Sequence, residues 1–176
     1  MKKLLAVTIA LMMILCCVPV YADDATGVIL IATKDGLISS APVWKGESEA
    51  VQPSGMLWTE NGVFVTDVFN KQIYLETTKG SSVVAGKLAE ATYNGAPAAT
   101  YKDAAAREAG FAEPWAIASF LDGYAISDPA VNAVRYYDGK DVKTIKNGLN
   151  NPTGLASDGT NLYIADTGNG KVLKIN

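Results

Sequence analysis

Residues 152–176 read "PTGLASDGTNLYIADTGNGKVLKIN", and this stretch decides the fold because related stretches begin at Pro53 and Pro114. In each copy an aspartate lies fourteen residues after the proline, and an aliphatic residue follows that aspartate by six. An asparagine also follows each aspartate by three or four residues. The landmarks are Asp67, Asp128 and Asp166, then Ile73, Val134 and Val172, then Asn70, Asn132 and Asn169. A repeat of this kind predicts a modular architecture.

Each repeat predicts three or four short antiparallel strands. A small apolar strand after the proline leads into an Asn-Gly or Asp-Gly pair, which favours a tight hairpin. A β-branched or aromatic strand then ends at the aspartate, whose carboxylate we expect to accept hydrogen bonds from amides of the next turn. An alternating strand follows, as in "QIYLE", "AVRYY" and "KVLKI". Four strands in roughly 38 residues predict the blade of an all-β propeller.

The proline start, the "LYIADTGN" strand and turn, and the closing "KVLKI" resemble the NHL repeat. The resemblance is strongest over 149–176 and implies an NHL-type β-propeller. Residues 27–46, "GVILIATKDGLISSAPVWKG", resemble the incomplete first blade with which exported bacterial members open. We therefore assign one propeller domain to 23–176, with blades at about 27–50, 51–86, 111–146 and 149–176. Two residues depart from the NHL pattern. Pro129 is expected to lengthen the turn after Asp128 by one residue, and Trp58 is bulky in a strand whose residues are usually small.

The predicted strands make up about three and a half blades, whereas closed propellers have four to eight. The first blade lacks its first strand, while the last already has three, so the two ends do not complement each other. We therefore expect a partial or open propeller with unpaired sheet edges, which favour self-association. Two explanations stay open: the chain is a truncated form of a longer propeller, or it assembles with itself.

The N-terminus has the pattern of a signal peptide. Lys2 and Lys3 precede an apolar run, and "VYA" at 20–22 has the small residues of a cleavage site. We expect secretion with cleavage after Ala22; the alternative is an uncleaved anchor. Both cysteines lie within this segment, so no disulfide is expected in the remaining chain. No second apolar span follows, and therefore no membrane association is expected after cleavage.

The charge balance argues against nucleic acid as a partner. The chain has 15 basic and 18 acidic residues, no histidine and a net charge of −3 at pH 7. Loss of the two leader lysines would make it more acidic still. An acidic protein is poorly suited to phosphate-rich partners.

An insertion at 87–110 separates the second and third predicted blades. Its end, "DAAAREAG", predicts a short helix capped by Asp103 and terminated by Gly110. Two roles are open for the insertion: it covers the edge of a blade, or it covers a ligand.

The missing histidine bears on catalysis. The NHL resemblance includes lyases that use histidines for metal binding or proton transfer, and this chain has none. We therefore assign no catalytic, cofactor-binding or metal-binding residue. Because Asp67, Asp128 and Asp166 recur in every copy, we interpret them as structural. The other residues interpreted as structural are Pro53, Pro114, Pro152 and Asn169. A calcium site of aspartate and backbone oxygens in the central channel is the alternative.

Trp58 and Trp115 are predicted on the innermost strands, where most blades have small residues. They either fill the propeller axis or form a stacking surface for a sugar or a peptide side chain. The function predicted from the sequence is an exported, non-catalytic scaffold that binds an extracellular protein or a glycan. The alternative is a carboxylate- and calcium-dependent propeller lyase or lactonase.

Overall fold

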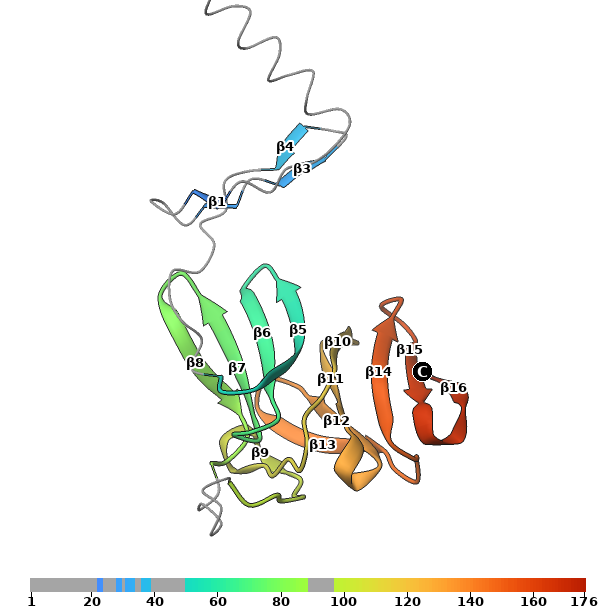
Figure 1. Ribbon diagram of the computed structural model, residues 1–176. Coiled ribbons are helices and arrows are strands. Elements are labelled where there is room, and N and C mark those ends of the chain that lie inside the picture. The colour runs from blue at the N-terminus through green and yellow to red at the C-terminus, as the bar shows by residue number, and fades with distance from the viewer. Residues whose placement is uncertain (1–21, 24–27, 30, 34–35, 39–49, 89–96) are drawn as a thin grey trace, which may run out of the picture. The chain divides into compact units, whose positions relative to one another are not determined.

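The computed structural model describes residues 22–23, 28–29, 31–33, 36–38, 50–88 and 97–176 (Figure 1). The chain divides into two compact units, Met1–Lys45 and Gly46–Asn176. In the first unit, β1 (Ala22–Asp23) pairs with β2 (Val28–Ile29), and β3 (Ile31–Thr33) pairs with β4 (Gly36–Ile38). The β3–β4 hairpin lies within the predicted incomplete blade. The rest of that blade and residues 1–21 of the predicted signal peptide fall mainly outside the described residues.

The second unit contains three consecutive antiparallel sheets, which we name blades 1, 2 and 3 (Figure 1). Blade 1 consists of β5 (Pro53–Thr59), β6 (Gly62–Asp67), β7 (Gln72–Thr77) and β8 (Gly80–Ala85). Blade 2 has β10 (Ile117–Phe120), β11 (Gly123–Asp128), β12 (Ala133–Tyr137) and β13 (Asp141–Lys146). Blade 3 has β14 (Pro152–Ser157), β15 (Leu162–Asp166) and β16 (Lys171–Ile175). These sheets confirm the all-β fold class.

The strand register is the same in the three blades. The third residue after each proline pairs with the second residue before each aspartate, and each aspartate pairs with the residue five positions later. The first set of pairs is Met56–Val65, Ile117–Ile126 and Leu155–Ile164; the second is Asp67–Gln72, Asp128–Ala133 and Asp166–Lys171. The sequence repeat is therefore a repeat of backbone pairing as well.

The constant register shows that the expectation for Pro129 was wrong, because the turn after Asp128 has the same length as the other two. Asn132 has a φ of 55° and occupies the left-handed position that Lys71 and Gly170 fill in the other blades. Asn132 is therefore structurally equivalent to Lys71 and Gly170. It is not equivalent to Asn70 and Asn169, with which the sequence repeat aligned it.

The blades pack face to face, as in a partial β-propeller. Blades 1 and 2 enclose a core that includes Phe64, Ile73 and Ile126. Blades 2 and 3 enclose a second core that includes Val134 and Ile164. The first strand of blade 2, β10, contacts both β5 and β14, so the three first strands lie next to one another. No helix in the described part of the chain has the length and apolar character needed to cross a bilayer.

The predicted helix at 103–110 was wrong. The segment forms the two-residue strand β9 (Ala104–Ala105) and the 3-10 turn η1 (Ala106–Glu108). Strand β9 pairs with β13 and adds a fifth strand at the edge of blade 2. The carboxylate of Asp103 does not cap η1, because it accepts hydrogen bonds from the Thr144 N–H (2.9 Å) and the Arg135 guanidinium (2.8 Å). Tertiary contacts have overridden the local helix preference.

Candidate functional site

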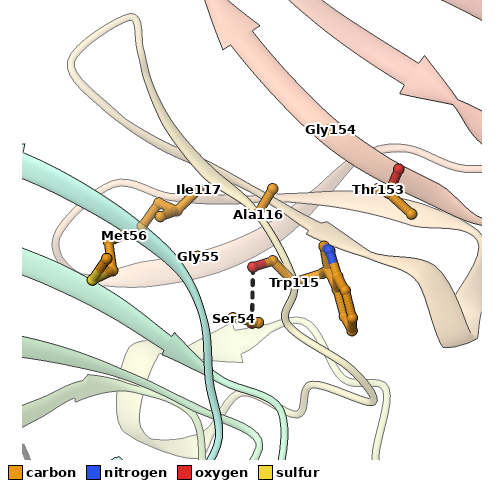
Figure 2. Close-up of a pocket in the computed structure, with 8 residues that line it drawn as sticks. All are labelled: Ser54, Gly55, Met56, Trp115, Ala116, Ile117, Thr153 and Gly154. Carbon is orange, nitrogen blue, oxygen red and sulfur yellow. Dashed lines mark hydrogen bonds between the residues drawn. The ribbon is translucent and has the colours of Figure 1, made fainter.

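An open pocket lies where the first strands of the three blades meet (Figure 2). Every lining residue comes from the segment directly after one of the three repeat prolines. The volume of the pocket is about 330 Å³. The lining residues are Ser54, Gly55 and Met56 from blade 1, Trp115, Ala116 and Ile117 from blade 2, and Thr153 and Gly154 from blade 3. We name this the axial pocket, because corresponding residues of all three blades converge on it.

The two tryptophans predicted on the innermost strands, Trp58 and Trp115, have different surroundings. Trp115 lines the axial pocket between Ser54 and Thr153, and the residue is 40% exposed (Figure 2). Among the described residues none accepts a hydrogen bond from its indole N–H. Trp58, on β5, is 74% exposed and does not line the pocket. Trp115 therefore lies where the first strands of the three blades meet, whereas Trp58 does not.

Hydroxyl groups on the second strands hold the wall of the pocket in place. In blade 1, the Gly55 N–H donates to Thr66 Oγ1 (2.7 Å). The Thr66 hydroxyl in turn donates to the carbonyl oxygen of Trp115 in blade 2 (2.7 Å). The Ser54 hydroxyl also donates to that carbonyl oxygen (2.9 Å). A Cβ atom at Gly55 would collide with the same carbonyl, which explains the glycine. The backbone of Trp115 is therefore fixed by contacts from the preceding blade.

The same bridge joins blades 2 and 3. The Ala116 N–H donates to Ser127 Oγ (2.9 Å), and the Ser127 hydroxyl donates to the carbonyl oxygen of Thr153 (3.1 Å). In blade 3 the corresponding residue is Ala165, which has no hydroxyl. Side chains directly before two of the three repeat aspartates thus position the backbone of the next blade at the pocket.

Each repeat aspartate is the last residue of the second strand of its blade, and none of the three lines the pocket. Asp128 Oδ2 accepts from the Ala112 N–H (3.0 Å) and Asp128 Oδ1 from the Glu113 N–H (2.7 Å), both just ahead of the proline. Asp166 accepts from the Asn150 N–H (2.6 Å) and from the Asn169 side chain (2.8 Å). The expected partners, backbone amides of the following turn, are found for Asp67, whereas the backbone donors to Asp128 and Asp166 precede the blade. Each aspartate joins the end of its second strand to the segment that precedes its blade.

Asp67 has the fullest set of partners. It accepts from the backbone N–H groups of Val51 (2.7 Å), Gln52 (3.2 Å), Phe69 (2.8 Å) and Asn70 (3.1 Å), and from the Asn70 side chain (2.9 Å). The side chain of Asp67 is fully buried. Its oxygens are committed to protein donors.

Burial and hydrogen bonding act in opposite directions on the pKa values of the other two aspartates. Burial raises the pKa of Asp128, against the lowering effect of its two backbone N–H donors and of Arg135. The Asn150 N–H, followed by the Asn169 side chain, lowers the pKa of Asp166. Neither carboxylate lines the axial pocket.

Within the described part of the chain, no three His, Cys, Asp or Glu side chains group closely enough to hold a metal ion. A calcium site of aspartate and backbone oxygens stays a prediction.

Two of the solved structures that resemble the chain are described here, and both are β-propeller-like. A structural genomics protein of unknown function from Bacteroides thetaiotaomicron VPI-5482 matches 86% of this chain and 42% of its own, with a TM-score of 0.57 and 18% identity. Virginiamycin B lyase from Staphylococcus aureus matches 71% of this chain and 41% of its own, with a TM-score of 0.45 and 13% identity.

The chain thus spans less than half of either matched structure. The likeness to the Bacteroides thetaiotaomicron structure concerns the fold alone. No family model matches the chain, and no curated protein matches it.

Most of the pocket was not predicted from the sequence. Trp115 was selected because it is bulky at a position where small residues are usual. Thr66 and Ser127 gave a weaker signal: each is a hydroxyl residue directly before the repeat aspartate, in "VTD" and "ISD". The third repeat has an alanine at this position, in "IAD". Ser54 and Thr153 occupy corresponding positions after Pro53 and Pro152. Aligning the repeats on their prolines could have found this set, but the alignment does not reveal that the segments meet.

Proposed function

We propose that the chain is an exported, non-catalytic NHL-type propeller scaffold that binds an extracellular protein or glycan through the axial pocket. The observation that carries the proposal is the exposed indole of Trp115 in a pocket lined by three blades. An indole offers a flat apolar face and one N–H donor, which suits a sugar ring or a planar peptide side chain. Backbone and hydroxyl groups around it supply polar partners for orientation.

The backbone of Trp115 is held by hydrogen bonds on both sides. The carbonyl oxygen of Trp115 accepts from Ser54 and contacts Thr66, and the Trp115 N–H donates to the carbonyl oxygen of Ser127 (2.9 Å). A residue whose backbone is already ordered costs less conformational entropy when a ligand binds than one in a mobile segment. This favours a binding role for the residue.

No observation favours the lyase or lactonase alternative to the same degree. The three aspartates that it would use accept hydrogen bonds from backbone or asparagine N–H groups and lie outside the pocket. The axial pocket itself is lined by hydroxyl, amide, thioether, aliphatic and indole groups.

Replacing Trp115 with alanine is expected to reduce ligand capture by roughly tenfold or more, since buried aromatic anchors dominate binding energies. The measurement is binding of labelled protein to a glycan microarray and to a peptide array. Leu121→Ala is the matched control, because Leu121 is a large exposed side chain outside the pocket. Equal array signals for the wild type and Trp115→Ala, with both proteins folded, would rule out the axial pocket as the binding site.

A further inference from the structure

Asparagine–glycine pairs occur at residues 61–62, 94–95, 147–148 and 169–170. This dipeptide can deamidate without an enzyme, because glycine has no side chain to hinder the attack of its backbone nitrogen on the asparagine before it. The pair at 94–95 lies outside the described residues. The other three have the same dipeptide sequence, but the fold gives each of them different surroundings.

The reaction needs two groups that are free to approach each other. The backbone nitrogen of the glycine bonds to Cγ of the asparagine, and Nδ2 leaves as ammonia with the proton that the glycine N–H gives up. The resulting succinimide ring is opened by one water molecule. Opening at one carbonyl carbon gives aspartate, and opening at the other gives isoaspartate, whose main chain runs through the former side chain.

At Asn147 both groups are free. Asn147 and Gly148 lie between β13 and β14, and both residues are exposed. Among the described residues, none forms a hydrogen bond with the Asn147 side chain or with the Gly148 N–H. Gly148 has a φ of 68°, and a Cβ atom at Gly148 would have no heavy atom within 4 Å. The attack of Gly148 on Asn147 therefore breaks no hydrogen bond of the described structure.

At Asn169 both groups are engaged. Its Nδ2 atom donates to Asp166 Oδ2 (2.8 Å), and its side-chain oxygen accepts from Asn150 Nδ2 (3.5 Å). The Gly170 N–H donates to the carbonyl oxygen of Thr167 (3.1 Å). These hydrogen bonds must be lost before Gly170 can attack Asn169.

At Asn61 the glycine is held in a hairpin. Gly62 is the first residue of β6 and pairs with Thr59 of β5. The Thr59 hydroxyl donates to the carbonyl oxygen of Gly62 (2.9 Å) and accepts from the Asn61 N–H (3.3 Å). The carbonyl oxygen of Glu76 fills the space that a Cβ atom of Gly62 would occupy. The glycine therefore reaches Asn61 only if this end of the hairpin opens.

We propose that Asn147 is a deamidation site, at which water is consumed, ammonia is released and a new carboxylate forms, whereas the fold protects Asn61 and Asn169. All three asparagines precede glycine, so the difference in reactivity comes from their hydrogen bonds and packing. This site is independent of the axial pocket, which none of the three asparagines lines.

The isoaspartate product would alter the connection between blades 2 and 3. On one side of the site Lys146 pairs with Val134. On the other side Leu149 is buried in the second core, and its N–H donates to the carbonyl oxygen of Asn132 (3.1 Å). Isoaspartate lengthens the main chain between these two anchors by one carbon atom, whereas aspartate leaves its length unchanged. Only the isoaspartate form is therefore expected to loosen the attachment of β14.

The test is timed incubation of the folded full-length protein in mildly alkaline buffer, followed by trypsin digestion and mass spectrometry with electron-transfer fragmentation. Cleavage after Lys146 and Lys171 places Asn147 and Asn169 in one peptide, so each sample contains its own reference. We expect Asn147 to convert about tenfold faster than Asn169, because hydrogen bonds at Asn169 must first be lost. In urea the two rates should become similar. Asn147→Gln should remove the fast conversion.

Equal rates for Asn147 and Asn169 in the folded protein would overturn the proposal. A difference that persists unchanged in urea would also overturn it, because the neighbouring sequence would then be its cause. Hydrogen exchange tests the consequence for the fold: the Leu149 and Asn151 N–H groups should exchange faster in the purified isoaspartate form than in freshly prepared Asn147→Asp. Equal exchange in these two proteins would overturn the loosening of β14.

Discussion

Replacing Arg135 with alanine is expected to lower the free energy of unfolding by about 3–5 kcal/mol, the usual loss when one partner of a buried ion pair is removed. Arg135, on β12, is fully buried. Its Nη1 atom lies 3.7 Å from Oδ2 of the equally buried Asp128 and donates to the carbonyl oxygen of Gly110 (2.8 Å). Its Nη2 atom donates to the carbonyl oxygen of Lys102 (3.0 Å) and to Asp103 (2.8 Å).

The effect should be large because one side chain joins the insertion to blade 2. The guanidinium carbon also lies 4.9 Å from the ring centre of Tyr101 and 5.2 Å from that of Phe111. Without the guanidinium, the Asp128 carboxylate would remain buried with no cation beside it. The carbonyl oxygens of Gly110 and Lys102 would each lose one of two donors and keep a backbone N–H. The segment from Tyr101 to Phe111 is then expected to separate from blade 2 before the blades themselves unfold.

The measurement is urea unfolding followed by circular dichroism, with hydrogen exchange of the insertion as a local readout. Lys143→Ala is the control, because Lys143 forms an exposed ion pair with Asp138 at 3.6 Å, and such pairs contribute little. Its unfolding midpoint should equal that of the wild type. Arg135→Ala with a midpoint as high as that of Lys143→Ala would contradict the anchoring role.

Replacing Asp67 with alanine is the second change with a large expected effect, a loss of about 3–5 kcal/mol from several unsatisfied donors. Four backbone N–H groups, from Val51, Gln52, Phe69 and Asn70, would lose their acceptor at once. The substitution would release the segment ahead of β5 from the end of β6.

Asp166→Ala provides a graded comparison within the same repeat position. Asp166 accepts one backbone hydrogen bond, from Asn150, and one from the Asn169 side chain. Thermal and urea unfolding of the two variants should therefore give a clearly smaller loss for Asp166→Ala than for Asp67→Ala. Equal losses would mean that the number of donors is not what makes these aspartates structural.

The sequence carried enough information for the fold because the repeat landmarks coincide with strand pairing. The fourteen-residue spacing places Pro53 opposite Asp67 and Pro152 opposite Asp166 in the sheets. This spacing is fixed by the hairpin and by two short strands, which are local features. A repeat of local features is readable without knowledge of long-range contacts.

The insertion could not be read in the same way. "DAAAREAG" has the composition of a helix, but Asp103 binds Thr144 and Arg135, which lie far away in the sequence. Helix propensity is a weak influence that such contacts override. The expectation that Pro129 lengthens its turn was wrong for a related reason. The pairing of Asp128 with Ala133 fixes the length of the turn, and the proline does not change it.

The axial pocket depends on contacts between blades, which no single repeat encodes. Trp115 stood out by its size, but its position beside Ser54 and Thr153 follows from the packing of β5, β10 and β14 against one another. The hydroxyl bridges from Thr66 and Ser127 also cross from one blade to the next. Such relations become visible only after the blades are placed in space.

The most direct test of the account is a nuclear Overhauser measurement between blades 1 and 2 in solution. The position of a Cβ atom at Gly55 lies 3.0 Å from the Cα atom of Ala116, so the α-protons of these two residues must be close if the proline-led segments converge. We predict a cross-peak between the α-protons of Gly55 and Ala116. A fully assigned spectrum without that cross-peak would mean that the first strands do not meet, and it would contradict the axial pocket.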